Sequence, residues 1–213
     1  MIESILPVGT VAVDTFIDPP GATLFPEEAA LVAKAVEKRR LEFTTARWCA
    51  RRAMAELGRP PAPVLRGERG QPRWPAGLVG SMTHCAGYRG AVLAPRESFT
   101  TIGIDAEPNE PLPDGVFETV TRPGERPHID ELLREHPAVR WDRLLFSAKE
   151  SIYKSWFPLT SRWLGFEEAE LDIDPSAGTF SARILATGGP TGFDGRWMAG
   201  EGLILTAIAV PAG

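Results

Sequence analysis

The chain has 213 residues, 43% hydrophobic and 24% charged, which is enough to bury a core as one large domain or two smaller halves. Its apolar runs, such as residues 203–210, are much shorter than the roughly 20 residues that cross a bilayer, so we expect no membrane segment. The first residues lack the basic and apolar regions of a signal peptide, and Cys49 and Cys85 lack metal-ligand spacing. These features predict a cytoplasmic protein with reduced thiols.

The net charge of −5 is unevenly distributed along the chain. Residues 1–100 carry 13 Lys or Arg against 10 Asp or Glu, whereas residues 101–213 carry 10 against 18. Within the first half, residues 34–73 hold 11 basic and four acidic residues. A local basic field in an acidic protein favours a small polyanionic ligand over long nucleic acid, which usually requires a basic face across a whole domain. On charge alone, a solvated helix face is the alternative.

Strand and helix signals alternate in the first half of the chain. Residues 11–16 predict a strand, and Pro26 followed by two acids predicts a helix start. Helical signals continue to Leu57, where Gly58 and two prolines end them. Because a helix of about 30 residues exceeds the usual length, we expect a break near residues 41–45. A loop over 60–75, a segment over 78–84 and strands over 88–93 and 101–105 follow.

The second half begins with a proline-rich segment. Residues 108–137 contain six prolines and little periodicity, which predicts a hinge or insertion between two halves. A helical period returns over residues 140–156, with a buried stripe formed by Leu144, Leu145, Ala148, Ile152 and Trp156. A hairpin over 171–173 and 179–186 and closing strands over 196–198 and 203–210 follow. We therefore expect an α+β fold of two α/β halves, residues 1–106 and 107–213.

Asp105 and Glu107 lie two residues apart on a predicted strand, so their carboxylates point to the same face. Two carboxylates held this close repel each other, so either a cation lies between them or one of them becomes protonated. Oxygen ligands of this kind suit a hard ion such as Mg²⁺. The pair alone also fits two solvated acids on an edge strand, so both interpretations stay open.

Glu150 and Lys154 lie four residues apart on the predicted helix and share a face. An ordinary surface ion pair is one explanation. Against it, the segment is too apolar for a free surface, since it includes Trp141, Phe146 and Trp156. Charges that border a buried stripe need a partner or a purpose.

The two charged segments together resemble the paired signature of Sfp-type 4′-phosphopantetheinyl transferases. In that family a G-I/V-D-x-E motif precedes a W/F-S/C-x-K-E-A/S-x-x-K motif, as GIDAE (103–107) precedes FSAKESIYK (146–154) here. Upstream, GSMTHC (80–85) resembles the family's Ser-His segment, and Gly-Gln-Pro (70–72) resembles its Gly-Lys-Pro turn with Gln71 replacing Lys. Residues 47–52, 74–77, 156–160 and 163–166 are similar to the enterobactin-type and PptT-like branch. The resemblance covers residues 25–210.

The resemblance implies two pseudo-twofold halves with the active site in the cleft between them. It also implies transfer of phosphopantetheine from coenzyme A to a carrier-protein serine, with release of 3′,5′-ADP. By match to the family motifs, the Mg²⁺ ligands are Asp105, Glu107 and Glu150, with Mn²⁺ as an alternative ion. Glu150 also matches the proposed base, and it forms the expected catalytic set with Asp105 and Lys154. The expected coenzyme A contacts are Arg39, Arg47, Arg66, Thr83, His84, Lys149 and Lys154.

The resemblance further implies acyl or peptidyl carrier proteins as partners, from polyketide, nonribosomal-peptide or fatty-acid systems. We expect a monomer with no nucleic-acid or membrane partner. Two alternatives are an inactive coenzyme A- or carrier-binding module of the same fold and another metal-dependent phosphoryl-transfer or hydrolysis enzyme. The intact acidic and lysine positions argue against the first, and the sequence has no P-loop, G-x-G-x-x-G helix start or H-E-x-x-H motif to support the second.

Overall fold

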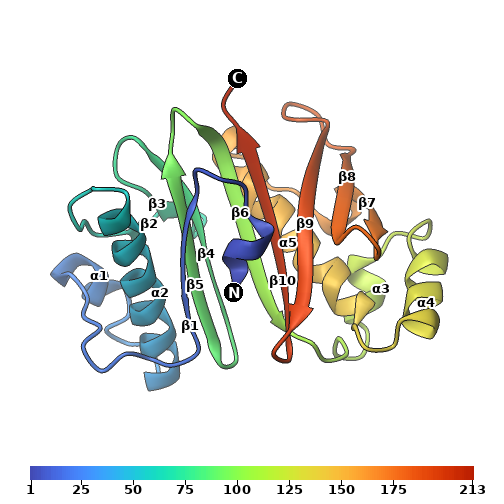
Figure 1. Cartoon of the computed structure of the whole chain (residues 1–213), viewed down its shortest axis with the longest axis horizontal. Helices are drawn as coiled ribbons and strands as arrows, with labels where there is room; N and C mark the ends of the chain where they lie inside the picture. The colour runs from blue at the N-terminus through green and yellow to red at the C-terminus, as the bar shows by residue number, and fades with distance from the viewer.

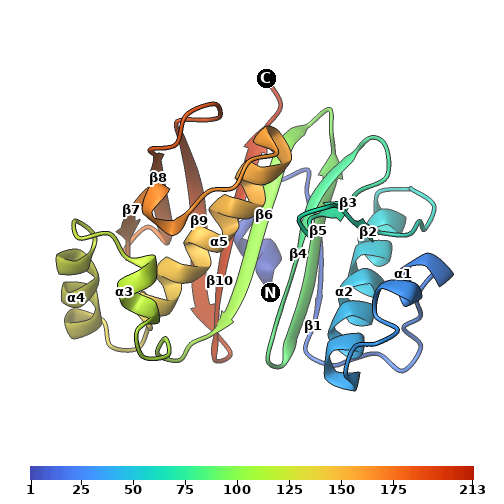
Figure 2. The same ribbon diagram turned by 180° about the vertical axis from the view of Figure 1, so that it is seen from behind.

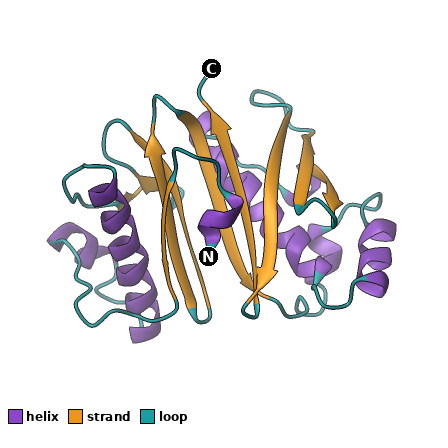
Figure 3. Cartoon of the chain, viewed as in Figure 1, coloured by secondary structure: helices purple, strands orange, loops and turns teal.

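The chain folds into two main antiparallel sheets, each packed against one long helix (Figure 1). A computed structural model describes all residues, 1–213. The first sheet has the strand order β1-β5-β4 and packs against α2, and the second has the order β6-β10-β9-β8-β7 and packs against α5. This arrangement confirms the expected α+β fold with two α/β halves (Figure 3). None of the helices combines the length and apolar composition that spanning a bilayer requires.

The first half contains the smaller sheet and the basic helix. Its elements are η1 (Ile2–Ile5), β1 (Val11–Thr15), α1 (Pro26–Leu31), α2 (Glu37–Glu56), β2 (Leu65–Arg66), β3 (Pro72–Arg73), β4 (Leu78–Cys85) and β5 (Tyr88–Pro95). The prediction of a helix break near residues 41–45 was wrong, because the break between α1 and α2 lies at residues 32–36. Phe43 and Ala46 are both buried in the middle of α2, so a break there would interrupt the apolar stripe.

The second half contains the larger sheet and α5. Its elements are β6 (Phe99–Pro108), α3 (Val116–Val120), α4 (Arg126–Glu135), α5 (Trp141–Thr160), η2 (Phe166–Glu168), β7 (Ala169–Asp174), β8 (Thr179–Ile184), β9 (Gly192–Gly200) and β10 (Leu203–Pro211). The predicted stripe of α5 is confirmed, because its five apolar side chains are fully buried against the sheet. The strand β6 spans the expected boundary between residues 106 and 107 and pairs with β10 along its length.

The proline-rich segment 108–137 contains more regular structure than we expected, because it forms α3 and α4. Pro127 lies in the first turn of α4, where a missing backbone N–H costs no helical hydrogen bond. The segment also covers the outer edge of the larger sheet. Glu125 Oε1 accepts a hydrogen bond from Leu171 N at 2.8 Å, and His128 Nε2 lies 3.0 Å from Ile173 O, both on β7. The insertion thus protects an edge strand that would otherwise expose unpaired backbone groups.

The two sheets meet where β4 and β6 run side by side (Figure 2). No backbone ladder joins these strands, and two hydroxyl groups of β4 accept hydrogen bonds from β6 instead. Ser81 Oγ binds Ile104 N at 3.1 Å, and Thr83 Oγ1 binds Ala106 N at 3.0 Å. Because both hydroxyls are buried, they satisfy backbone donors that water cannot reach. This seam fixes β6, which carries Asp105 in its second half, against the first half of the molecule.

Gly103 lets α5 approach β6 closely. A Cβ atom at this position would lie 2.1 Å from the backbone oxygen of Ser151 and 2.3 Å from Ser155 Oγ. Both distances are shorter than any van der Waals contact, so only glycine fits between the strand and the helix. The glycine of the GIDAE segment therefore sets the separation between the two elements that carry the charged motifs.

We predict that Gly103→Ala lowers the free energy of unfolding by about 1–3 kcal/mol, because α5 must shift away from β6 to accept the added methyl group. Chemical denaturation monitored by circular dichroism measures this loss. Gly21→Ala is the matched control, because an added Cβ at Gly21 meets no atom within 4 Å. Equal stability of the Gly103→Ala variant and the wild type would contradict the close packing described above.

Candidate active site

A cavity of about 640 Å³ lies between the two halves of the molecule. From the first half it is lined by four predicted phosphate-binding residues, Arg39, Arg47, Arg66 and His84. From the second half it is lined by α5 and by Thr100, Thr101 and Ile102 of β6, whereas Asp105 and Glu107 are not among the lining residues. The lining residues of α5 include Glu150, Tyr153, Lys154 and Phe157. The structure therefore brings basic residues of segment 34–73 and charged residues of the FSAKESIYK motif (146–154) to the same cavity.

Arg39, Arg47 and Arg66 form a basic wall of the cavity, and Arg47 and Arg66 lie against Phe43 of α2. The Arg47 guanidinium lies 3.2 Å from the centre of the Phe43 ring, and the Arg66 guanidinium lies 5.0 Å from it. Burial and the charges of Arg66, Arg51 and Arg39 together lower the pKa of Arg47 to about 9, against the opposing effect of Glu28. Burial and the charge of Arg39 also lower the pKa of Arg66. Crowded guanidinium groups of this kind favour the binding of a multiply charged anion.

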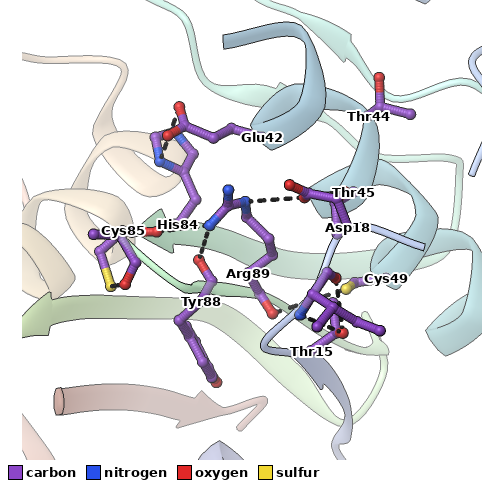
Figure 4. Close-up of polar contacts among 12 residues, drawn as sticks. Thr15, Asp18, Glu42, Thr44, Thr45, Cys49, His84, Cys85, Tyr88 and Arg89 are labelled. Atoms are coloured by element: carbon purple, nitrogen blue, oxygen red, sulfur yellow. Dashed lines mark hydrogen bonds and ion pairs between the residues drawn. The ribbon is translucent and has the colours of Figure 1, made fainter. Parts of the chain in front are cut away.

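His84 lies at the end of β4, next to the basic wall. Its Nε2 atom is 2.5 Å from Arg39 Nη1. Its Nδ1 atom lies 3.8 Å from Glu42 Oε2 (Figure 4). Burial, followed by the charge of Arg39, lowers the pKa of His84, so the imidazole is neutral and Nε2 accepts a hydrogen bond from Arg39. Arg89 holds the same hairpin end by donating to Cys85 O at 2.7 Å.

The carboxylates of the GIDAE segment are each bound to a cation of α5. Asp105 Oδ1 lies 2.8 Å from Lys154 Nζ, and Asp105 Oδ2 accepts a hydrogen bond from Ser147 Oγ at 2.9 Å. Glu107 Oε2 lies 2.9 Å from Arg143 Nη1. These contacts join the part of β6 that carries the two acids to the face of α5 that carries Arg143, Ser147 and Lys154. Glu150 forms no ion pair of this kind and lines the cavity.

The three carboxylates retain an excess of negative charge despite these cations. Burial and the charge of Asp105 together raise the pKa of Glu107 to about 7, because Arg143 and Lys154 only partly oppose them. Burial and the charge of Asp105 also raise the pKa of Glu150. Ionisation of Glu107 and of Glu150 therefore costs free energy, because both are buried and lie near Asp105. A bound cation would relieve this repulsion.

The donor set fits a divalent cation in its chemistry, because all three side chains offer carboxylate oxygens and Asp105 repels both glutamates. Their arrangement is less complete. The structure assembles no group of three or more His, Cys, Asp or Glu side chains around a single metal position. Lys154 and Ser147 engage both oxygens of Asp105, so a cation at Asp105 would have to compete with the Lys154 ammonium group.

Two of the predicted coenzyme A contacts lie away from the cavity. Thr83 is buried in the seam, where its hydroxyl binds Ala106 N and lies 3.4 Å from Asp105 Oδ1. Lys149 points to the opposite side of α5, where its ammonium lies 2.8 Å from Glu125 Oε2 and 2.8 Å from Val120 O. It also donates to Phe166 O at 3.0 Å. We expected Lys149 to bind a phosphate of coenzyme A, but its ammonium group lies away from the cavity. It instead joins α5 to the insertion at residues 108–137.

The sequence analysis did not identify three residues that support the site. Phe43 lines the cavity, Arg143 binds Glu107, and Glu28 binds Arg47 from outside the cavity. Arg143 could have been identified from the sequence, because it lies seven residues before Glu150 and thus about two helical turns away on the same face. Glu28 was interpreted only as an acid near a helix start. Its contacts with Val64 and Arg51 join segments that are 36 and 23 residues away in the chain, and no local pattern indicates them.

We predict that Lys149→Met lowers the free energy of unfolding by about 3–5 kcal/mol while leaving the KM for coenzyme A unchanged. The loss follows because Glu125 would remain buried and ionised without its cation. The double variant Lys149→Met/Glu125→Gln removes that charge but keeps an acceptor for Leu171 N, so it should recover part of the stability. Denaturant titration and steady-state kinetics provide the two measurements. A raised KM with unchanged stability would instead assign Lys149 to phosphate binding.

Comparison with known proteins agrees with this geometry. The family model of the 4′-phosphopantetheinyl transferase N-terminal domain matches residues 27–94, and that of the 4′-phosphopantetheinyl transferase superfamily matches residues 101–197. The chain is 55% identical to 4′-phosphopantetheinyl transferase Svp of Streptomyces mobaraensis, over all of this chain and 90% of that protein. It is 50% identical to 4′-phosphopantetheinyl transferase PptT of Mycobacterium tuberculosis, over 99% and 98% of the two chains. It is 49% identical to 4′-phosphopantetheinyl transferase Npt of Nocardia iowensis, over 98% and 99%.

Proposed function

The chain belongs to the Sfp-type 4′-phosphopantetheinyl transferases, and from this premise we propose that Asp105, Glu107 and Glu150 hold the divalent cation of the reaction. The activity of the chain is the transfer of phosphopantetheine to carrier proteins. The single observation that carries the proposal is the placement of Asp105 and Glu107 on β6 near Glu150 on α5, where burial and the charge of Asp105 raise the pKa of both glutamates and Glu150 lines the basic cavity.

The basic wall binds the phosphate end of coenzyme A in this proposal. Arg39, Arg47, Arg66 and His84 line one cavity, where burial, followed by the charges of neighbouring arginines, lowers the pKa of Arg47 and of Arg66. A bound phosphate would compensate this crowded positive charge. Guanidinium groups recognise phosphate through paired hydrogen bonds. His84 is neutral, so it orients the Arg39 guanidinium by accepting its hydrogen bond rather than adding another charge.

Charge stabilisation at the pyrophosphate is assigned to the second half. A Mg²⁺ or Mn²⁺ ion bound by the three carboxylates supplies electrostatic stabilisation of the departing 3′,5′-ADP. Lys154 contributes a further positive charge next to Asp105. Phosphoryl transfer depends mainly on such positioning and charge compensation, so these groups account for most of the catalysis that the protein must provide.

Glu150 is the proposed base for the carrier serine. It lines the cavity, and its pKa is raised by burial and by Asp105. A carboxylate with a raised pKa holds a proton better, which improves its ability to accept one from a weakly acidic hydroxyl group. It forms no ion pair in the structure, so its oxygens are free to face the substrate and the cation.

The two halves of the chain have different tasks in this proposal. Residues 1–106 supply the basic wall, and residues 107–213 supply Glu107 and α5. Asp105 lies on β6, which crosses the boundary between these ranges and belongs to the sheet of the second half. We assign carriers of polyketide, nonribosomal-peptide and fatty-acid synthases as acceptors, and we propose a monomer as the active form. One chain already contains both sides of the cavity, so the site needs no second copy.

The test is a transfer assay with an apo carrier protein, coenzyme A and Mg²⁺, read by intact mass. The wild type should add about 340 Da to the carrier, the mass of a phosphopantetheine group. Glu150→Gln should abolish transfer while leaving the circular dichroism spectrum unchanged, because it removes a cation ligand and the base together. Glu131→Gln, an exposed position on α4, is the matched control and should retain full activity.

Two results would contradict the proposal. A wild-type protein that modifies no member of a panel of polyketide, nonribosomal-peptide and fatty-acid carriers would contradict the acceptor assignment. Turnover of Glu150→Gln near the wild-type rate would exclude Glu150 from both roles and leave the cation with two carboxylates.

A further inference from the structure

Glu28 of α1 is a fully buried carboxylate outside the cavity. Its oxygens accept hydrogen bonds from Val64 N at 2.7 Å and Phe25 N at 3.0 Å. The same carboxylate lies 2.9 Å from Arg51 Nη1 and 3.7 Å from Arg47 Nε. A buried charge with this many partners is held in a fixed position, because each lost contact would leave a polar group unsatisfied.

The contacts of Glu28 lead directly to the basic wall. Arg47 donates from Nε to Val64 O at 3.0 Å, so Glu28 and Arg47 bind the N–H and the C=O of the same residue. Val64 immediately precedes β2, which carries Arg66. One carboxylate therefore fixes both the Arg47 side chain and the backbone from which Arg66 projects into the cavity.

The two arginines need this support because they lie close together. Their guanidinium groups both approach the Phe43 ring, Arg47 at 3.2 Å and Arg66 at 5.0 Å from its centre. Like charges at this separation repel, and the aromatic ring offsets only part of that repulsion. In the absence of a phosphate, Glu28 is the only carboxylate that forms an ion pair with Arg47.

We propose that Glu28 is a positioning residue that gives the site its selectivity for the 3′-phosphate of coenzyme A, by holding Arg47 and Arg66 in place for it. Glu28 contacts no ligand itself. The proposal rests on the proposed function, since it takes the basic wall as the binding site of that phosphate. It predicts that loss of the Glu28 charge, or withdrawal of its carboxylate from Val64 and the arginines, weakens binding only of ligands that carry the 3′-phosphate.

The test compares Glu28→Gln with Glu27→Gln, an exposed neighbour on the same helix. For Glu28→Gln, the KM for coenzyme A should rise by about fivefold or more with little change in kcat. The reason is that the lost phosphate contacts stabilise the bound substrate and the transition state equally. The KM for 3′-dephospho-coenzyme A should stay within about twofold of the wild-type value. Glu27→Gln should change neither KM.

A binding measurement separates this inference from the transfer activity. Calorimetric titration with 3′,5′-ADP and with 5′-AMP tests the same selectivity without a carrier protein, so it remains informative even if the wild type transfers nothing. Glu28→Gln should weaken 3′,5′-ADP binding and leave 5′-AMP binding unchanged. If Glu28→Gln does not fold, Glu28→Asp replaces it, because the shorter side chain keeps the charge but cannot reach Val64 and Arg51 together. Equal weakening of both ligands, or of neither, would overturn the proposal.

Discussion

The close contact between α5 and β6 is the constraint on which the candidate site depends. Because Gly103 has no side chain, the helix reaches the strand at a distance that any Cβ would prevent. At this separation Lys154 Nζ lies 3.0 Å from Ile104 O and 2.8 Å from Asp105 Oδ1, and Ser147 reaches the other oxygen of Asp105. The seam hydroxyl of Thr83 holds the strand from the opposite side. Asp105 thus has little freedom to move, and Glu150 lies on the same helix.

Each half of the molecule holds an excess of one charge near the cavity. In the first half, Arg47 and Arg66 crowd around one aromatic ring, and only a buried carboxylate opposes them. In the second half, three carboxylates are opposed by Lys154 and Arg143. Neither imbalance is corrected by the protein alone. A ligand that carries a phosphate at one end and a cation-binding pyrophosphate at the other complements both, and coenzyme A has this form.

Local patterns in the sequence predicted the elements that carry the charged motifs. The apolar period of α5 and the spacing of Asp105 and Glu107 follow from helix and strand geometry, so they could be deduced without a structure. Contacts between distant segments could not. Lys149 borders a buried stripe in sequence, yet its ammonium binds the insertion because the Glu125 carboxylate is buried there. The helix also continues through residues 41–45, where Phe43 is buried, and the length of the helical signal did not indicate that the break would precede α2.

The central claim is that carboxylates from β6 and α5 form a single cation site. Titration with Mn²⁺, followed by electron paramagnetic resonance in the presence of coenzyme A, measures the number and affinity of such sites directly. The wild type should bind one ion, and Glu107→Ala and Glu150→Ala should each weaken that site, because the ligands come from both elements. Wild-type Mn²⁺ affinity in the Glu150→Ala variant would contradict the claim and place the cation on β6 alone.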